Sequence, residues 1–63
     1  MIELVIERWT NFDQSVDYLW SVWHDGERIE TGGTHASAES AEDQAMTYCR
    51  QALGAKPDRV TRL

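Results

Sequence analysis

The stretch DYLWSVWHDGERIETGG (residues 17–33) places Asp25-Gly26 between two runs of alternating apolar and polar residues. An Asp-Gly pair in this setting is the strongest short signal for a β-hairpin, because both central residues of a type I′ turn need a positive φ. The turn sets the strand register through three expected cross-strand pairs: Val22 with Ile29, Trp23 with Arg28, and Trp20 with Thr31. We therefore expect Ile29 and Thr31 on the inner face of a strand after the turn.

The segments before this hairpin predict another strand and a tight return. Residues 2–9, IELVIERW, are rich in β-branched side chains that alternate between two faces, which is typical of a strand. Residues 10–15, TNFDQS, contain the usual turn formers and can reverse the chain into a strand over residues 16–24. The side chains expected to face the core are Ile2, Leu4, Ile6, Val16, Tyr18, Trp20 and Val22.

Residues 37–54, SAESAEDQAMTYCRQALG, predict the one helix of the chain, with Ser37 as its N-cap and Gly54 just beyond its end. At about 100° per residue, seven apolar side chains fall within an arc of about 140°: Ala38, Ala41, Ala45, Tyr48, Cys49, Ala52 and Leu53. Glu42 alone lies inside this arc. We expect it at the margin of the sheet, where Arg8 or Arg28 can pair with it.

The fold class that follows is α+β, in the order β-β-β-α-β. An antiparallel three-stranded meander carries one amphipathic helix on one face, and residues 59–63 add a short C-terminal strand after Pro57, whose place in the sheet stays open. The 63 residues form a single domain, residues 1–63. A chain of this size buries only about 60% of its unfolded surface, so we expect a monomer or a weak homodimer of modest stability.

Composition excludes several classes of protein. One cysteine cannot form an internal disulfide, and no apolar run approaches the roughly 18 residues that span a bilayer. We therefore expect a cytoplasmic protein that does not enter a membrane. Cys49 falls on the buried stripe of the helix, and His24 and His35 fall on opposite faces, so we expect no enzyme, no metal site and no cofactor.

Charge is distributed unevenly along the chain, whose net charge is −5. Residues 1–49 contain ten acidic and two basic side chains, which gives −8, whereas residues 50–63 contain one acidic and four basic side chains, which gives +3. Two interpretations stay open. The acidic surface can attract a basic partner, or it can be a solvated surface to which the basic C-terminal segment closes salt links.

Trp20 and Trp23 lie three residues apart in one expected strand, so their indoles point to opposite faces of the sheet. The outer face is expected to carry Trp23 beside apolar and acidic side chains: Val5, Trp9, Leu19, Glu3, Glu7, Asp17 and Glu30. Arg28 is placed to stack on Trp23. Aromatic residues interleaved with acids are the opposite of a nucleic-acid-binding surface, so we expect no direct contact with nucleic acid.

Exposed aromatic residues beside acids allow two explanations. Trp23 can pack beneath a loop, such as the one that holds Phe12, or cover neighbouring backbone. Alternatively, the outer face contacts a basic protein or nucleoprotein complex, because tryptophan is favoured at binding hot spots and carboxylates steer basic partners. The residues expected to bind that partner are Glu3, Glu7, Trp9, Asp17, Trp23, Arg28, Glu30, Glu39, Glu42 and Asp43.

Residues 31–45, TGGTHASAESAEDQA, together with the β-β-β-α-β order, resemble the small domain of HicB-type antitoxins. In that family a glycine-containing third strand leads into a helix that is capped by Ser or Thr and rich in Ala and Glu. The resemblance implies the same α+β fold and, as one possible function, a protein-binding module that masks a small basic toxin.

A second resemblance is one of class. A small acidic chain without a catalytic set is similar to phage-encoded inhibitors, above all anti-CRISPR proteins, many of which block the basic nucleic-acid channel of a CRISPR-Cas surveillance complex. Duplex DNA presents one charge per about 1.7 Å of its axis, and Glu3 and Glu7 lie about 13 Å apart along one strand. We therefore expect a stoichiometric inhibitor that mimics DNA in the host cytoplasm, with an antitoxin-like module as the alternative.

Overall fold

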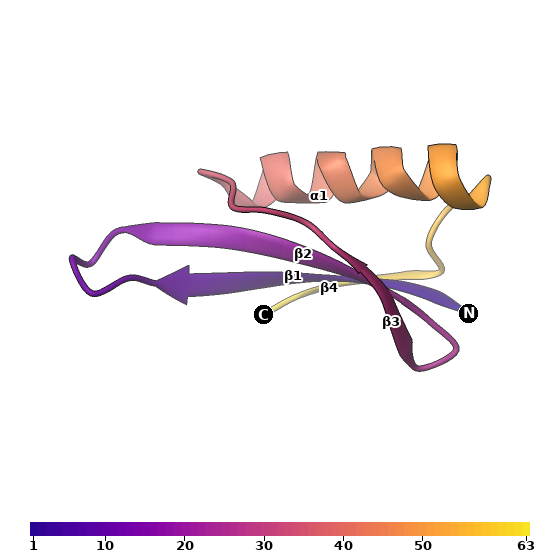
Figure 1. Ribbon diagram of the computed structural model, residues 1–63, viewed down its shortest axis with the longest axis horizontal. Helices are drawn as coiled ribbons and strands as arrows, with labels where there is room; N and C mark the ends of the chain where they lie inside the picture. Colours follow the sequence, from indigo (N-terminus) through magenta and orange to yellow (C-terminus); the bar gives the residue numbers. More distant parts are fainter.

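A computed structural model describes residues 1–63 and has the expected α+β architecture (Figure 1). One helix lies on one side of a four-stranded sheet, and the order β-β-β-α-β is confirmed. The elements are β1 (Ile2–Thr10), β2 (Val16–His24), β3 (Glu27–Thr31), α1 (Ala38–Tyr48), a π-helical turn η1 (Cys49–Leu53) and β4 (Arg59–Arg62).

The strands are arranged in the order β3-β2-β1-β4. β1 and β2 pair antiparallel over their full nine-residue lengths, and β3 extends this meander on the far side of β2. β4 runs parallel to β1 on its other edge, beside residues 3–6. The short C-terminal strand is thereby confirmed, and its place is beside the first strand rather than beside the third.

The core lies between α1 and one face of the sheet. Leu4, Ile6 and Val22 are almost completely buried on the strands, beneath three small residues of the helix layer, Ala41, Ala45 and Cys49. Small side chains let a helix lie close to a sheet, so that the strand residues supply most of the packed volume. Ser37 caps the helix, since its hydroxyl accepts a hydrogen bond from the Ser40 amide at 3.1 Å, as expected.

The β2–β3 hairpin turns at Asp25-Gly26 with positive φ at both residues, and Trp23 pairs with Arg28 as expected. Beyond that pair the expected register is wrong. A bulge lies between Val22 and Trp23 in the pairing, and Val22 pairs with Glu30 while Ser21 pairs with Thr31. One extra residue in β3 reverses the faces that follow it. Ile29 and Thr31 are therefore both exposed rather than on the inner face. The expected cross-strand pairs Val22 with Ile29 and Trp20 with Thr31 do not form.

The large side chain of Trp20 gives a physical reason for the bulge. Gly32 lies beside the indole and donates its amide to the Trp20 carbonyl at 2.8 Å. A Cβ on Gly32 would lie 1.8 Å from Nε1 of Trp20, which no side chain can do. The shifted register puts this glycine, and not Thr31, next to the indole, so that the chain can pass close to it.

The C-terminal end of the helix differs from the expected regular arc. Residues 49–53 form the π-helical turn, which has a wider hydrogen-bond spacing than an α-helix and therefore rotates the side chains that follow. Ala52 and Leu53 are exposed as a result, although the arc predicted them to face the sheet. Met46, outside that arc, packs against the core instead.

Candidate partner-binding surface

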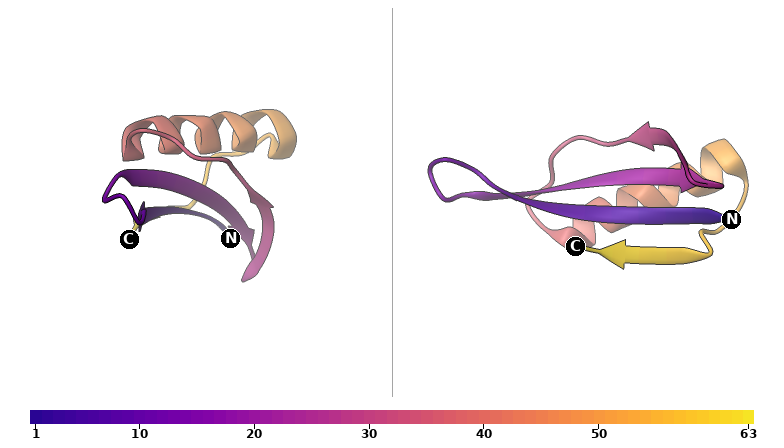
Figure 2. Two further views of the ribbon diagram at one scale, coloured as in Figure 1. Left: turned by 60° about the vertical axis from the view of Figure 1, so that its left-hand side comes forward. Right: turned by 90° about the horizontal axis from the view of Figure 1, so that it is seen from below.

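The second face of the sheet has no layer upon it, as the side view in Figure 2 shows. Figure 1 likewise shows α1 above the sheet and no part of the chain below the sheet. We call this surface the open face. By register and strand alternation it carries Glu3, Val5, Glu7 and Trp9 from β1, Asp17, Leu19, Ser21 and Trp23 from β2, Arg28 and Thr31 from β3, and Arg59 and Thr61 from β4.

The open face is close to electrically balanced. Its three acids are Glu3, Glu7 and Asp17, and its two cations are Arg28 and Arg59. Glu3 is already neutralised, because its carboxylate lies 3.2 Å from Nε of Arg59 and accepts a hydrogen bond from Thr61 at 2.9 Å. Two of the three acids therefore stay available to a partner, and both lie toward the β1–β2 turn.

Trp23 is half-buried because it covers its own strand. Its indole N–H donates to Oγ of Ser21 at 2.9 Å, and Ser21 is only 5% exposed. The interpretation in which Trp23 covers its neighbours therefore accounts for part of its burial. The proposed covering loop does not, since Phe12 is fully exposed at the other end of the molecule. No stacked pair joins Trp23 to Arg28; the one aromatic pair is Trp20 with Tyr48.

Trp9 is the most exposed indole of the open face, with 55% of its surface accessible. Its N–H donates to Oε2 of Glu7 at 3.1 Å, and Asp17 is its direct cross-strand partner. Glu7 and Asp17 are diagonal neighbours, a relation that places residues roughly 7–8 Å apart. Neither acid forms an ion pair within the chain. We call Trp9, Glu7 and Asp17 the Trp9 site.

The loop beside this site is ordered by its own polar side chains. Asn11 donates to Oδ2 of Asp17 at 2.7 Å and to Oγ of Ser15 at 3.1 Å. Asp13 accepts from the hydroxyl and the amide of Ser15 at 2.6 and 3.0 Å, and these hydrogen bonds lower the pKa of Asp13. The loop thereby presents Phe12 to solvent beside the Trp9 site.

Phe12 is a surface residue that sequence reasoning used only as a possible cover for Trp23. The available signal was its position: a phenylalanine within a run of turn-forming residues has no strand or helix face on which to be buried. A single exposed apolar side chain is normal on a protein surface, so Phe12 indicates a contact surface only together with the exposed indole of Trp9.

A shallow hollow of about 260 Å³ connects the Trp9 site to β3 across the open face. Its walls include Glu7 and Trp9 at one end and Arg28 and Thr31 at the other, with Leu19 between them. The hollow is large enough for a side chain, and an acidic residue, Glu7, and a basic residue, Arg28, both line it. A partner residue can therefore insert between the two ends.

The other acids expected to bind a partner do not join this surface. Glu39, Glu42 and Asp43 belong to α1, which lies on the opposite side of the sheet (Figure 1). Glu42 lies at a margin, as expected, but its cation is neither Arg8 nor Arg28: its carboxylate is 3.0 Å from Nε of Arg62. Because of the bulge, Glu30 also pairs with a helix-side residue of β2, Val22. One flat partner surface cannot contact all ten expected residues.

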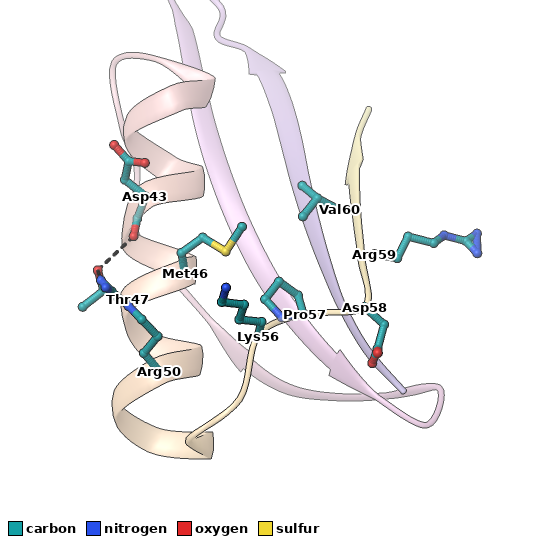
Figure 3. Close-up of a pocket in the computed structure, with 9 residues that line it drawn as sticks. All are labelled: Asp43, Met46, Thr47, Arg50, Lys56, Pro57, Asp58, Arg59 and Val60. Carbon is teal, nitrogen blue, oxygen red and sulfur yellow. Dashed lines mark hydrogen bonds between the residues drawn. The ribbon is translucent and has the colours of Figure 1, made fainter.

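A larger cleft, of about 550 Å³, lies between the end of the helix and β4 (Figure 3). Lys56 turns toward Met46 in this cleft, whereas Arg59 points away from it, in agreement with its ion pair to Glu3. Arg59 and Arg62 both pair with acids of other elements, so half of the basic side chains in residues 50–63 close salt links within the chain.

The groups that could carry chemistry lie apart. No three His, Cys, Asp or Glu side chains are close enough together to hold a metal ion. Cys49 is completely buried, and burial raises the pKa of its thiol. Nδ1 of His35 is 2.9 Å from Oγ of Ser40, while His24 lies beside Asp25 at the other end of β2.

Comparison of the chain with models of protein families, with curated protein sequences and with solved structures found no match. The helix is too short and too polar to cross a membrane.

Proposed function

We propose that this protein is a stoichiometric inhibitor that binds a basic, nucleic-acid-binding surface of a partner protein through the Trp9 site and Phe12. The observation that carries the proposal is an exposed indole flanked by two carboxylates that have no cation within the chain. A lysine or arginine of a partner would complete this arrangement.

Two attractive terms act on such a cation. The face of an exposed indole attracts a cation by about 0.5–1 kcal/mol, and by about 2 kcal/mol once water is excluded. The free carboxylates of Glu7 and Asp17 add ion pairs, each of which contributes up to about 1 kcal/mol at a surface. Neither term gives tight binding alone. Burial of Trp9 and Phe12 against the partner supplies the larger share, as aromatic anchors do at interfaces.

Mimicry of DNA is the form of inhibition that suits these groups. Basic surfaces that bind nucleic acid hold rows of Lys and Arg for phosphates. Glu7, Asp13 and Asp17 gather three carboxylates around one end of the open face, and each is ordered by a hydrogen bond. The proposal therefore uses these three acids as phosphate substitutes. We propose that the protein belongs to the class of anti-CRISPR inhibitors that act in the host cytoplasm.

The test is capture of the partner from a cytoplasmic extract of the host with immobilised protein, followed by an assay of the captured protein. Fluorescence anisotropy with labelled duplex DNA measures whether the captured protein releases DNA as this chain is added. We expect release to be complete at a fixed molar ratio and to weaken with added salt, because screening reduces interactions between exposed charges.

Matched variants identify the surface. Trp9→Ala and the pair Glu7→Gln/Asp17→Asn should lose inhibition, whereas Arg8→Ala on the opposite side of β1 and Glu39→Gln/Asp43→Asn on the helix should retain it. Equal losses in both sets would contradict the Trp9 site. A captured protein that never binds nucleic acid would contradict the inhibitor, and capture of a small basic toxin would establish the antitoxin-like alternative in its place.

A further inference from the structure

The cleft between the end of the helix and β4 is lined by cations that the fold leaves unpaired. Residues 50–63 contain four basic side chains, of which Arg59 and Arg62 form ion pairs with acids of other elements. The other two, Arg50 and Lys56, are exposed and form no ion pair. Both line this cleft of about 550 Å³. The free positive charge of the C-terminal segment is therefore concentrated at one cavity.

The two cations lie at the closed end of the cleft. Arg50 belongs to η1, and Lys56 belongs to the segment that connects η1 to β4 and closes the cleft at that end (Figure 3). Nη2 of Arg50 donates to Oγ1 of Thr47 at 3.3 Å, which leaves the other N–H groups of the guanidinium free for a ligand. An anionic group at the closed end can therefore contact two cationic side chains.

Two acids also line the cleft, but they do not neutralise these cations. Asp43 lies seven residues before Arg50, which is roughly 10 Å along a helix at 1.5 Å per residue. Asp58 accepts a hydrogen bond from the amide of Ile2 at 2.7 Å, and its side chain points away from the helix (Figure 3). Neither acid forms an ion pair with Arg50 or Lys56. The closed end is therefore the positive end of the cleft.

Apolar side chains line the cleft beside the cations. Met46 and Pro57 are half-buried, and Val60 is 38% exposed. We call these three residues the apolar wall. Lys56 turns toward Met46, so its ammonium group lies near this wall (Figure 3). The C-terminal end of a helix favours a nearby cation by itself, but that effect requires no apolar cavity beside the cation.

We propose that this cleft binds a small organic anion, with its acidic group between Arg50 and Lys56 and its apolar body against the apolar wall. The volume of the cleft lies within the range of roughly 300–1,000 Å³ that small-molecule sites have. A peptide would have to continue past the connecting segment, so the closed end favours a compact ligand. The cleft lies on the helix side of the sheet, and the inference does not depend on the Trp9 site.

Two dyes that share an aromatic body test the need for a negative charge. Anilinonaphthalene sulfonate carries an anionic group, whereas N-phenylnaphthylamine is uncharged. Fluorescence titration should show saturable binding of the sulfonate dye at one site, about tenfold tighter than binding of the neutral dye, because two cations contact the sulfonate. Octanoate should displace the sulfonate dye. Inorganic phosphate at the same concentration should not displace it, because phosphate has no apolar body.

Matched variants test the two cations and the apolar wall. Arg50→Gln and Lys56→Gln should each weaken binding of the sulfonate dye about fivefold, since each removes one contact between opposite charges. Arg8→Gln makes the same change of net charge outside the cleft and should bind like wild type. Val60→Thr keeps a β-branched side chain in β4 and should weaken binding of both dyes. Circular dichroism confirms that each variant folds.

The methyl groups of the two methionines locate the bound dye by NMR. Met46 lines the cleft and Met1 does not, so only the Met46 signal should shift. Absence of saturable binding, equal affinities for the two dyes, unaffected Arg50 and Lys56 variants, or shifts at Trp9 in place of Met46 would each overturn the site. None of these outcomes bears on the proposed function, which is measured with a captured partner and with variants of the open face.

Discussion

Trp20 and Trp9 lie on opposite faces of the same sheet, and their surroundings differ in burial and in hydrogen bonding. Trp20 is 6% exposed, its ring centroid is 5.8 Å from that of Tyr48, and its indole N–H has no partner. Trp9 is 55% exposed, yet its indole N–H is bonded to Glu7. On the face of the sheet beneath α1, which we call the covered face, the Trp20 ring is packed but its N–H has no hydrogen-bond partner. On the open face, the Trp9 N–H has a partner but the ring is exposed to water.

The free energies involved explain why Trp20 can be buried although its N–H has no hydrogen-bond partner. Burying a large aromatic side chain removes roughly 200 Å² from water, which stabilises the fold by about 5 kcal/mol. An unmade hydrogen bond costs about 1–3 kcal/mol, which is less than the free energy gained by burying the Trp20 side chain. Trp9 gains no comparable free energy from burial, because its ring is largely exposed. The comparison indicates that residues of the covered face maintain the fold, and that the Trp9 site is free to serve binding.

The largest expected effect comes from truncating the two indoles. Trp20→Ala should destabilise the protein by about 3–5 kcal/mol, which is comparable with the total stability of a domain this small. Trp9→Ala should change stability by no more than about 0.5 kcal/mol, as exposed sites do. Urea unfolding followed by far-ultraviolet circular dichroism measures both. If Trp20→Ala does not fold, Trp20→Phe should still be less stable than Trp9→Phe.

The adjacent glycines provide a second comparison. Gly32→Ala should cost about 1–3 kcal/mol or more, because the new Cβ would overlap the Trp20 indole. Gly33→Ala should be nearly neutral, since no atom lies within 4 Å of a Cβ built there. Thermal unfolding of the two variants measures this difference, and equal stabilities would mean that the Trp20 indole does not lie against Gly32.

Replacing a valine by alanine on each face of the sheet should change the free energy of unfolding by a smaller amount. Val22→Ala removes two methyl groups from a completely buried position and should cost about 2 kcal/mol. Val5→Ala, on the open face, should cost less than about 1 kcal/mol in the monomer, because Val5 is only half-buried. A Val5→Ala cost as large as that of Val22→Ala in dilute solution would show that the open face belongs to the core.

The smallest expected effect concerns the loop that presents Phe12. Hydrogen bonds from Ser15 lower the pKa of Asp13, so they stabilise the loop fully above the ordinary aspartate pKa of about 3.9, and this contribution is lost as pH falls through the lowered value. Ser15→Ala should raise the pKa of Asp13, which carboxyl carbon shifts measure by NMR. An unchanged pKa would remove Ser15 as the cause.

Local patterns predicted much of this structure from residues that act on their neighbours. The Asp25-Gly26 turn, the Ser37 cap and the strand after Pro57 all follow from backbone preferences of a few adjacent residues. The bulge in β3 depends instead on how a distant ring, Trp20, packs against Gly32. The π-helical turn likewise depends on packing that periodicity assumes to be regular.

The candidate site was predicted less completely than the fold. Alternation placed Trp9 and Trp23 on the outer face correctly, but it does not measure exposure, and Trp23 covers Ser21 while Trp9 stays in water. Counting charges along the sequence also cannot distinguish two groups of acids that lie on different sides of the molecule. Glu7 and Asp17 lie on the open face, whereas Glu39 and Asp43 lie on the helix, and only folding separates them.

The most direct test of the Trp9 site is an NMR titration with an arginine-rich peptide, observed at the three indole N–H signals. Trp9, Trp20 and Trp23 have different surroundings and report separately. Saturable shifts of the Trp9 signal, with little change at Trp20 and loss of the effect in Glu7→Gln/Asp17→Asn, are the result expected. A Trp9 signal that does not move, or three signals that move equally, would contradict a cation-binding surface on the open face.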